Sequence, residues 1–79
     1  MAIVYLETLP ALKKAISAKT TKNVYVMPRV GILTLWVRVT KAEALSMLAE
    51  IAPDATPSDC EMGTGAFGTI NEYGEVYIG

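Results

Sequence analysis

Thr40-Lys41-Ala42-Glu43 has the pattern of a capping box, and it places the start of a helix in the middle of the chain. In this motif the Thr40 hydroxyl accepts a hydrogen bond from the free amide of Glu43, and the Glu43 carboxylate accepts one from the amide of Thr40. The pattern predicts a helix that begins at Thr40 and is stopped by Pro53. Its expected apolar stripe is Leu45, Leu48, Ile51 and Ala52.

Residues 32–39 lead into the capping box and predict the longest strand of the chain, because they are rich in β-branched and apolar side chains. Residues 23–27 predict a second strand, and Pro28 and Gly31 mark a turn between the two runs. We therefore expect a hairpin. Side chains alternate between the two faces of a strand, so the valines of residues 23–27 should lie on the buried face.

The N-terminal segment predicts a strand followed by a helix. Residues 2–6 form a short apolar run, and Thr8 then offers an N-cap for a helix. Leu9, Leu12 and Ile16 recur at helical spacing, so they should face the core.

The C-terminal segment predicts a second hairpin. Gly74 is suited to the left-handed position that ends a type I turn with a bulge. This turn would set Ile70 opposite Val76 and Thr69 opposite Tyr77, which keeps the apolar pair on one face.

The expected element order is thus β-α-β-β-α-β-β in a single domain of residues 1–79. The simplest fold of this order is an α+β, two-layer structure, with an antiparallel sheet and both helices on one face. It corresponds to a split β-α-β or ferredoxin-like arrangement with an added strand.

The charges of the chain are strongly segregated. All seven basic residues lie at or before Lys41, whereas seven of the eight acidic residues lie after it, so the net charge of −1 conceals two opposite halves. Because the late carboxylates have no neighbouring cation in the sequence, we expect an acidic face that binds a partner. Its expected members are Asp59, Glu61, Glu72 and Glu75.

Aromatic residues mark a second candidate surface, on the side of the sheet that the helices leave open. Its expected members are Tyr25, Trp36, Arg38 and Tyr77. Such side chains favour protein recognition, and they also suit single-stranded nucleic acid, whose bases stack on aromatic rings. A purely structural alternative is that the rings pack on one another across strands of a thin domain.

No catalytic constellation is visible in the sequence. Residues 63–70 contain G-x-G-x-x-G and resemble the glycine-rich loop of protein kinases. That loop works with a lysine on the following strand, but no basic residue follows Lys41 and the chain has no histidine. The carboxylates near Cys60 lack the spacing of a metal site. We therefore expect no enzyme activity, no catalytic residues, no cofactor and no metal.

These observations favour a small, cytoplasmic, non-enzymatic protein that binds another macromolecule as an inhibitor or modulator, with a nucleic-acid-handling complex as the expected partner. Compact chains without a catalytic set are typical of phage and mobile-element accessory proteins, including anti-CRISPR proteins, although no motif supports that association. The alternatives are direct binding of single-stranded nucleic acid and assembly with copies of itself. The apolar fraction of 52% also predicts a homodimer. No segment has the length and apolar character of a membrane span.

Overall fold

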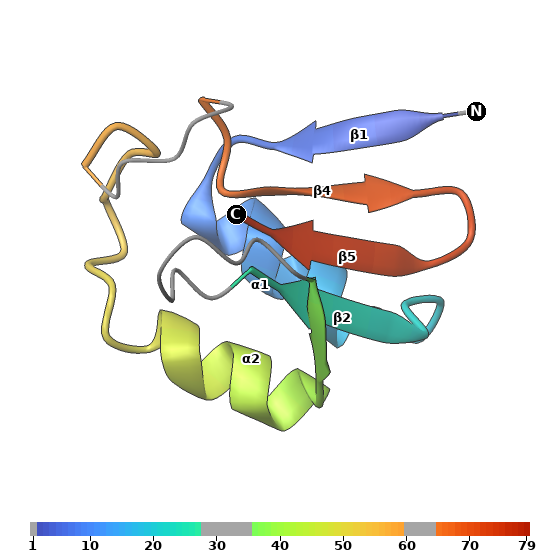
Figure 1. The fold of residues 1–79 in the computed structure, drawn as a ribbon. Helices are drawn as coiled ribbons and strands as arrows, with labels where there is room; N and C mark the ends of the chain where they lie inside the picture. Colours follow the sequence, from blue (N-terminus) through green and yellow to red (C-terminus); the bar gives the residue numbers. More distant parts are fainter. Residues whose placement is uncertain (1, 28–35, 60–64) are drawn as a thin grey trace.

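A computed structural model describes residues 2–27, 36–59 and 65–79 as one sheet covered by two helices (Figure 1). The element order is β-α-β-β-α-β-β, which confirms the predicted α+β class and order. The elements are β1 (Ile3–Leu6), α1 (Leu9–Ser17), β2 (Asn23–Val26), β3 (Val37–Val39), α2 (Lys41–Leu48), β4 (Gly68–Asn71) and β5 (Glu75–Ile78).

The five strands lie in the order β1-β4-β5-β2-β3. All neighbours are antiparallel except β2 and β5, so the sheet is mixed and the prediction of a wholly antiparallel sheet was wrong at this pair. The reason is topological. The strand-helix-strand unit β1-α1-β2 sets β1 and β2 in the same direction, and the β4-β5 hairpin lies between them. A hairpin inserted between two parallel strands must make one antiparallel contact and one parallel contact, so the β-α-β unit is indeed split.

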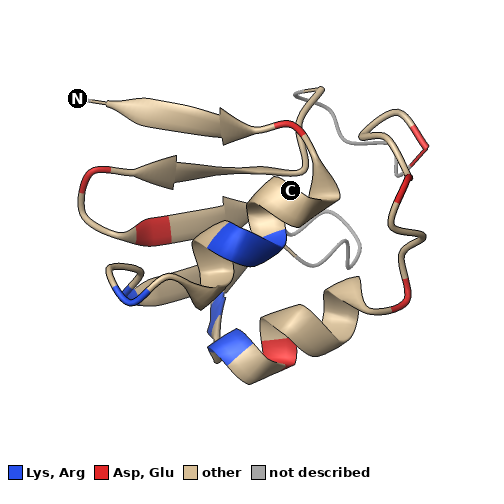
Figure 2. Cartoon of the chain, turned by 180° about the vertical axis from the view of Figure 1, so that it is seen from behind, with Lys and Arg blue, Asp and Glu red and all other residues tan. Residues whose placement is uncertain are grey.

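Both helices pack on one face of this sheet, as expected. Figure 2, seen from behind, shows α1 across the sheet and α2 beside it, and α2 contacts both α1 and β2. One apolar core joins the helices to the strands. Its buried members are Leu6, Leu9, Leu12, Ile16, Val24, Ala44, Leu48, Phe67 and Val76.

The helix boundaries follow from the predicted caps. Thr8 caps α1 by accepting from the amide of Ala11 at 3.3 Å. At α2 the Thr40 hydroxyl accepts from the amide of Glu43 at 3.1 Å, and Glu43 accepts from the amide of Thr40 at 3.3 Å, so the capping box is confirmed. The helix ends at Leu48, before the predicted stop at Pro53.

The buried side of α2 differs in part from the predicted stripe. Leu48 is buried, Leu45 and Ile51 pack partly against the core, and Ala52 is exposed. Ala44, which was not part of the predicted stripe, is fully buried. The helix ends before Ala52, and Ala44 lies on the side of α2 that faces the core.

Both predicted hairpins form, and the second has the predicted register. In the first, Val24 pairs with Val39, which puts the valines of β2 on the helix face. Residues 28–35, which include the first half of the predicted strand 32–39, lie outside the described residues. In the second, Ile70 pairs with Val76 and Thr69 with Tyr77.

Phe67 departs from the simple alternation of a strand. Its amide donates to the carbonyl of Leu6 at 2.9 Å, and the next residue, Gly68, is also paired with Leu6. Two residues therefore oppose one, which is the arrangement of a β-bulge, and a bulge re-aims a side chain. The Phe67 ring is fully buried in the core, although the sequence placed it only within a glycine-rich loop.

Gly74 fixes the end of the second hairpin against the turn that follows α1. It has a left-handed φ of 77°, and its carbonyl accepts from the amide of Lys22 at 2.7 Å. A Cβ atom at this position would collide with the carbonyl oxygen of Thr20. Glycine is therefore required at this turn for its conformation and for its lack of a side chain.

We predict that Gly74→Ala lowers the free energy of unfolding more than Gly65→Ala does. Both glycines have nearly the same φ, 77° and 75°, but a Cβ atom on Gly65 would meet nothing within 4 Å. Gly65→Ala should therefore show only the conformational cost, about 1–2 kcal/mol, whereas Gly74→Ala adds a steric clash. Urea denaturation followed by circular dichroism measures both. Equal losses would contradict the role assigned to the packed turn.

Candidate functional site

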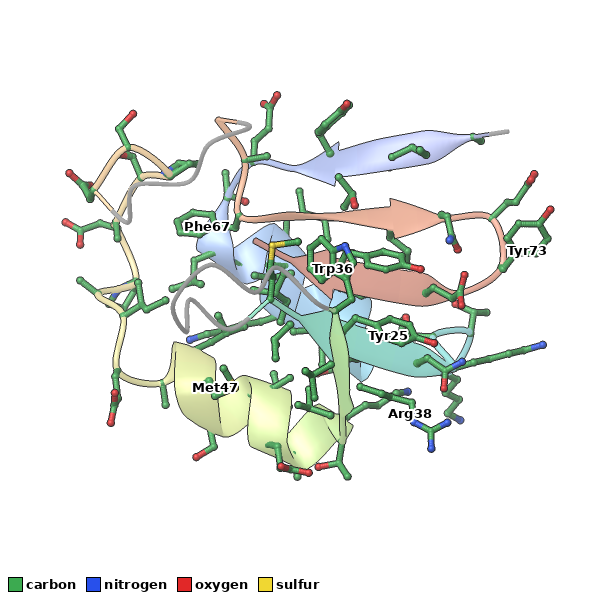
Figure 3. All side chains as sticks on the ribbon, viewed as in Figure 1. Tyr25, Trp36, Arg38, Met47, Phe67 and Tyr73 are labelled. Atoms are coloured by element: carbon green, nitrogen blue, oxygen red, sulfur yellow. The ribbon has the colours of Figure 1, made fainter. Side chains whose placement is uncertain are left out.

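Register pairing places one row of side chains across all five strands. Tyr5 pairs with Thr69, Thr69 with Tyr77, Tyr77 with Tyr25, and Tyr25 with Arg38. Paired residues share a face, and the buried valines of β2 and β5 occupy the opposite face. The row therefore lies on the face that the helices leave open (Figure 3).

Tyr25 and Tyr77 stack on each other at the centre of this row. Their ring centroids are 5.0 Å apart and their planes differ by 14°. At this separation and angle the two rings face each other, so each ring uses one of its faces for the mutual contact.

Trp36 packs over the same centre. Its ring lies 5.0 Å from that of Tyr77 at 78°, in an edge-to-face contact. The indole lies against Gly79, where an added Cβ atom would be in ordinary van der Waals contact with the ring, at 3.7 Å. The side chain remains 40% exposed, so it covers part of Tyr77 and still offers a surface of its own.

A polar cluster borders the stacked rings on the side of the β4-β5 turn. Glu75 accepts from the Asn71 amide group at 2.9 Å and from the Tyr25 hydroxyl at 3.5 Å. Asn71 in turn accepts from the backbone amides of Tyr73 and Glu75 at 2.9 and 3.1 Å. Glu75 is thus engaged within the protein, where it links the turn to the aromatic row.

This environment changes the acidity of Tyr77. Partial burial, followed by the negative charges of Glu75 and Tyr25, raises the pKa of the Tyr77 phenol, because each disfavours the phenolate.

The residues of this face form what we call the open-face patch: Tyr5, Tyr25, Trp36, Arg38 and Tyr77. Four of them were expected from the sequence, and the structure brings these four together. Tyr5, which is 58% exposed, was missed. Its alternation with Val4 and Leu6 indicates a strand, but only the pairing of β1 with β4 puts Tyr5 in the same row.

The predicted acidic face is not assembled as one surface among the described residues. Glu72 and Glu75 lie at the β4-β5 turn, whereas Asp59 lies in the segment after α2, at the opposite end of the sheet (Figure 1). Glu61 lies outside the described residues. Asp59 precedes β4 and the β4-β5 turn follows it, so β4 runs between these carboxylates and separates them.

Asp59 also has partners of its own. Its carboxylate accepts from the amide and the hydroxyl of Thr56 at 2.7 and 2.9 Å. These two hydrogen bonds, the backbone one first, lower the pKa of Asp59 because they stabilise the carboxylate.

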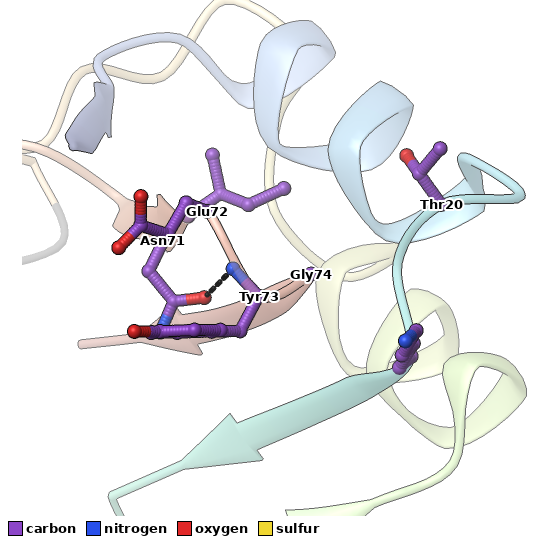
Figure 4. Close-up of a pocket in the computed structure, with 7 residues that line it drawn as sticks. Thr20, Asn71, Glu72, Tyr73 and Gly74 are labelled. Atoms are coloured by element: carbon purple, nitrogen blue, oxygen red, sulfur yellow. Dashed lines mark hydrogen bonds between the residues drawn. The ribbon is translucent and has the colours of Figure 1, made fainter. Parts of the chain in front are cut away.

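Two shallow depressions lie away from the open-face patch. One, of about 460 Å³, lies between the turn after α1 and the β4-β5 turn, and Figure 4 shows its lining of Thr20, Lys22 and residues 70–74. The other, of about 380 Å³, lies between the start of α1 and residues 53–57. Among the described residues, no group of three or more potential metal ligands comes together.

The chain was compared with family models, curated proteins and solved structures, and none of them matches it. Within the described ranges, no helix has both the length and the apolar character needed to cross a membrane.

We predict that Tyr77 makes the protein lose stability at alkaline pH. Because the folded state holds the Tyr77 proton more tightly, unfolding releases it between the ordinary tyrosine pKa of about 10 and the raised pKa, and stability falls as pH rises through this window. Urea denaturation across this range should show a smaller loss for Tyr77→Phe than for the unmodified protein. Tyr5→Phe is the matched control, and an equal effect of both substitutions would contradict the assignment.

Proposed function

We propose that this chain is a non-enzymatic protein-binding module that uses the open-face patch. The observation that carries the proposal is the mutual stacking of Tyr25 and Tyr77 beside Trp36 and Arg38. Rigid aromatic rings and an arginine are the side chains that dominate protein interfaces. The cluster is ordered by its own contacts, so little side-chain entropy is lost when a partner covers it.

A protein partner fits this patch better than single-stranded nucleic acid does. Bases stack on free ring faces, but Tyr25 and Tyr77 each use a face against the other. Nucleic acid also requires several cations along its backbone. In the described structure Arg38 is the only cation in the patch, and Glu75 lies at its border. Lys13 and Lys14 lie on α1, on the other side of the sheet (Figure 2).

An inhibitory role toward a nucleic-acid-handling complex, as in anti-CRISPR proteins, remains part of this proposal. The identity of the partner decides it. Affinity capture from the source cell followed by mass spectrometry supplies candidates, and binding of each purified candidate then tests the patch directly.

We predict that Arg38→Ala weakens binding of the captured partner about tenfold or more, which corresponds to at least about 1.4 kcal/mol. Arg38 is exposed, so the substitution should leave the fold intact. Lys14→Ala, an exposed cation on α1, is the matched control and should change the affinity little. Isothermal titration calorimetry measures both.

Three results would contradict the proposal. Equal losses for Arg38→Ala and Lys14→Ala would exclude the patch as the binding surface. A loss confined to Glu72→Gln would shift the site to the acidic turn. Binding of single-stranded oligonucleotides that weakens steeply with salt would favour the nucleic-acid alternative.

A further inference from the structure

β1 forms one edge of the sheet, so one side of its backbone lies outside the ladder. The carbonyl of Leu6 accepts from the amide of Phe67, which shows that Leu6 directs its backbone groups inward, toward the β4 side. These groups alternate in direction along a strand that pairs with an antiparallel neighbour. The backbone groups of Val4 therefore also point inward, toward β4, and the N–H and C=O groups of Ile3 and Tyr5 point outward, away from the sheet.

The side chains of this edge are also unusually exposed. Ile3, Val4 and Tyr5 are large apolar residues in succession, with 51%, 56% and 58% of their surfaces exposed. Residues 2–6 contain no charge and no proline, which are the usual devices that stop an edge strand from pairing. The described part of the opposite edge, β3, carries Arg38 at its centre, so pairing with a copy of itself would bring two arginines close together.

We propose that β1 pairs antiparallel with β1 of a second copy of this chain, about a two-fold axis at Val4. This register sets Ile3 opposite Tyr5 of the partner subunit and Val4 opposite Val4 of the partner subunit. The outward backbone groups of Ile3 and Tyr5 then bond to each other across the axis. Apolar side chains meet apolar side chains on both faces, and no charge is opposed.

A second copy is the occupant because the register is complementary to itself. The same three residues supply the donors, the acceptors and the apolar contacts on both sides of the axis. The pairing joins two five-stranded sheets into one continuous sheet. Tyr5 belongs to both surfaces, but this proposal does not depend on the proposed function of the open-face patch, since the stacked rings, Trp36 and Arg38 lie outside β1.

Disulfide cross-linking tests the register in the full chain carrying Cys60→Ser. In the proposed pairing Val4 and its counterpart form a non-hydrogen-bonded pair with Cα atoms about 4.5 Å apart, within disulfide range. Val4→Cys should therefore give a covalent dimer under mild oxidation. Ile3→Cys is the matched control. Its two copies are offset by two residues, about 7 Å along the strand, beyond disulfide reach once the strand spacing is included.

Sedimentation velocity at tens of micromolar tests the association itself. The unmodified chain should sediment as a dimer, and Val4→Asp should shift it to a monomer by opposing two carboxylates across the axis. The exposure of Val4 predicts that this variant still folds, which circular dichroism checks. Arg38→Ala should remain a dimer. A monomeric unmodified chain, a dimer that survives Val4→Asp, or equal cross-linking at positions 3 and 4 would overturn the proposal.

Discussion

The parallel pairing of β2 with β5 joins the two halves of the sequence at the middle of the sheet, beside the β1-β4 pairing that joins them at its edge. β2 comes from the first third of the chain and β5 from its last residues. On the helix face this pairing sets Val24 beside Val76, and both are fully buried in the core. On the other face it sets Tyr25 beside Tyr77, and their rings stack. The same pairing thus supplies the centre of the core and the centre of the open-face patch.

Local patterns predicted the parts of the fold that depend on neighbours in sequence. The capping box at Thr40 set the start of α2, and Gly74 set the register of the last hairpin, because both act over a few residues. The parallel β2-β5 contact joins residues about fifty positions apart, and no local pattern specifies it. For this reason the sequence led to a wholly antiparallel sheet.

The same distinction applies to the candidate site. Alternation along each strand predicted that Tyr25, Trp36, Arg38 and Tyr77 share the open face. Including Tyr5 required the position of β1 at the sheet edge, which only the strand order provides. Charge segregation in sequence is a poor guide to charge segregation in space here, because Asp59 and the β4-β5 turn lie at opposite ends of β4.

The edge proposed for self-association would also determine how the open-face patch meets a partner. A two-fold axis between antiparallel strands of one sheet is perpendicular to that sheet, so the open faces of both copies would lie on the same side. Each patch keeps its own β2-β5 centre, and Tyr5 would lie between the two centres. A partner that has two equivalent sites could then contact both patches at once, and the second contact would form at a high effective concentration. Dimerisation through β1 would therefore raise the strength of binding without any new contact to the partner, whereas dimerisation through the open faces would bury the patch.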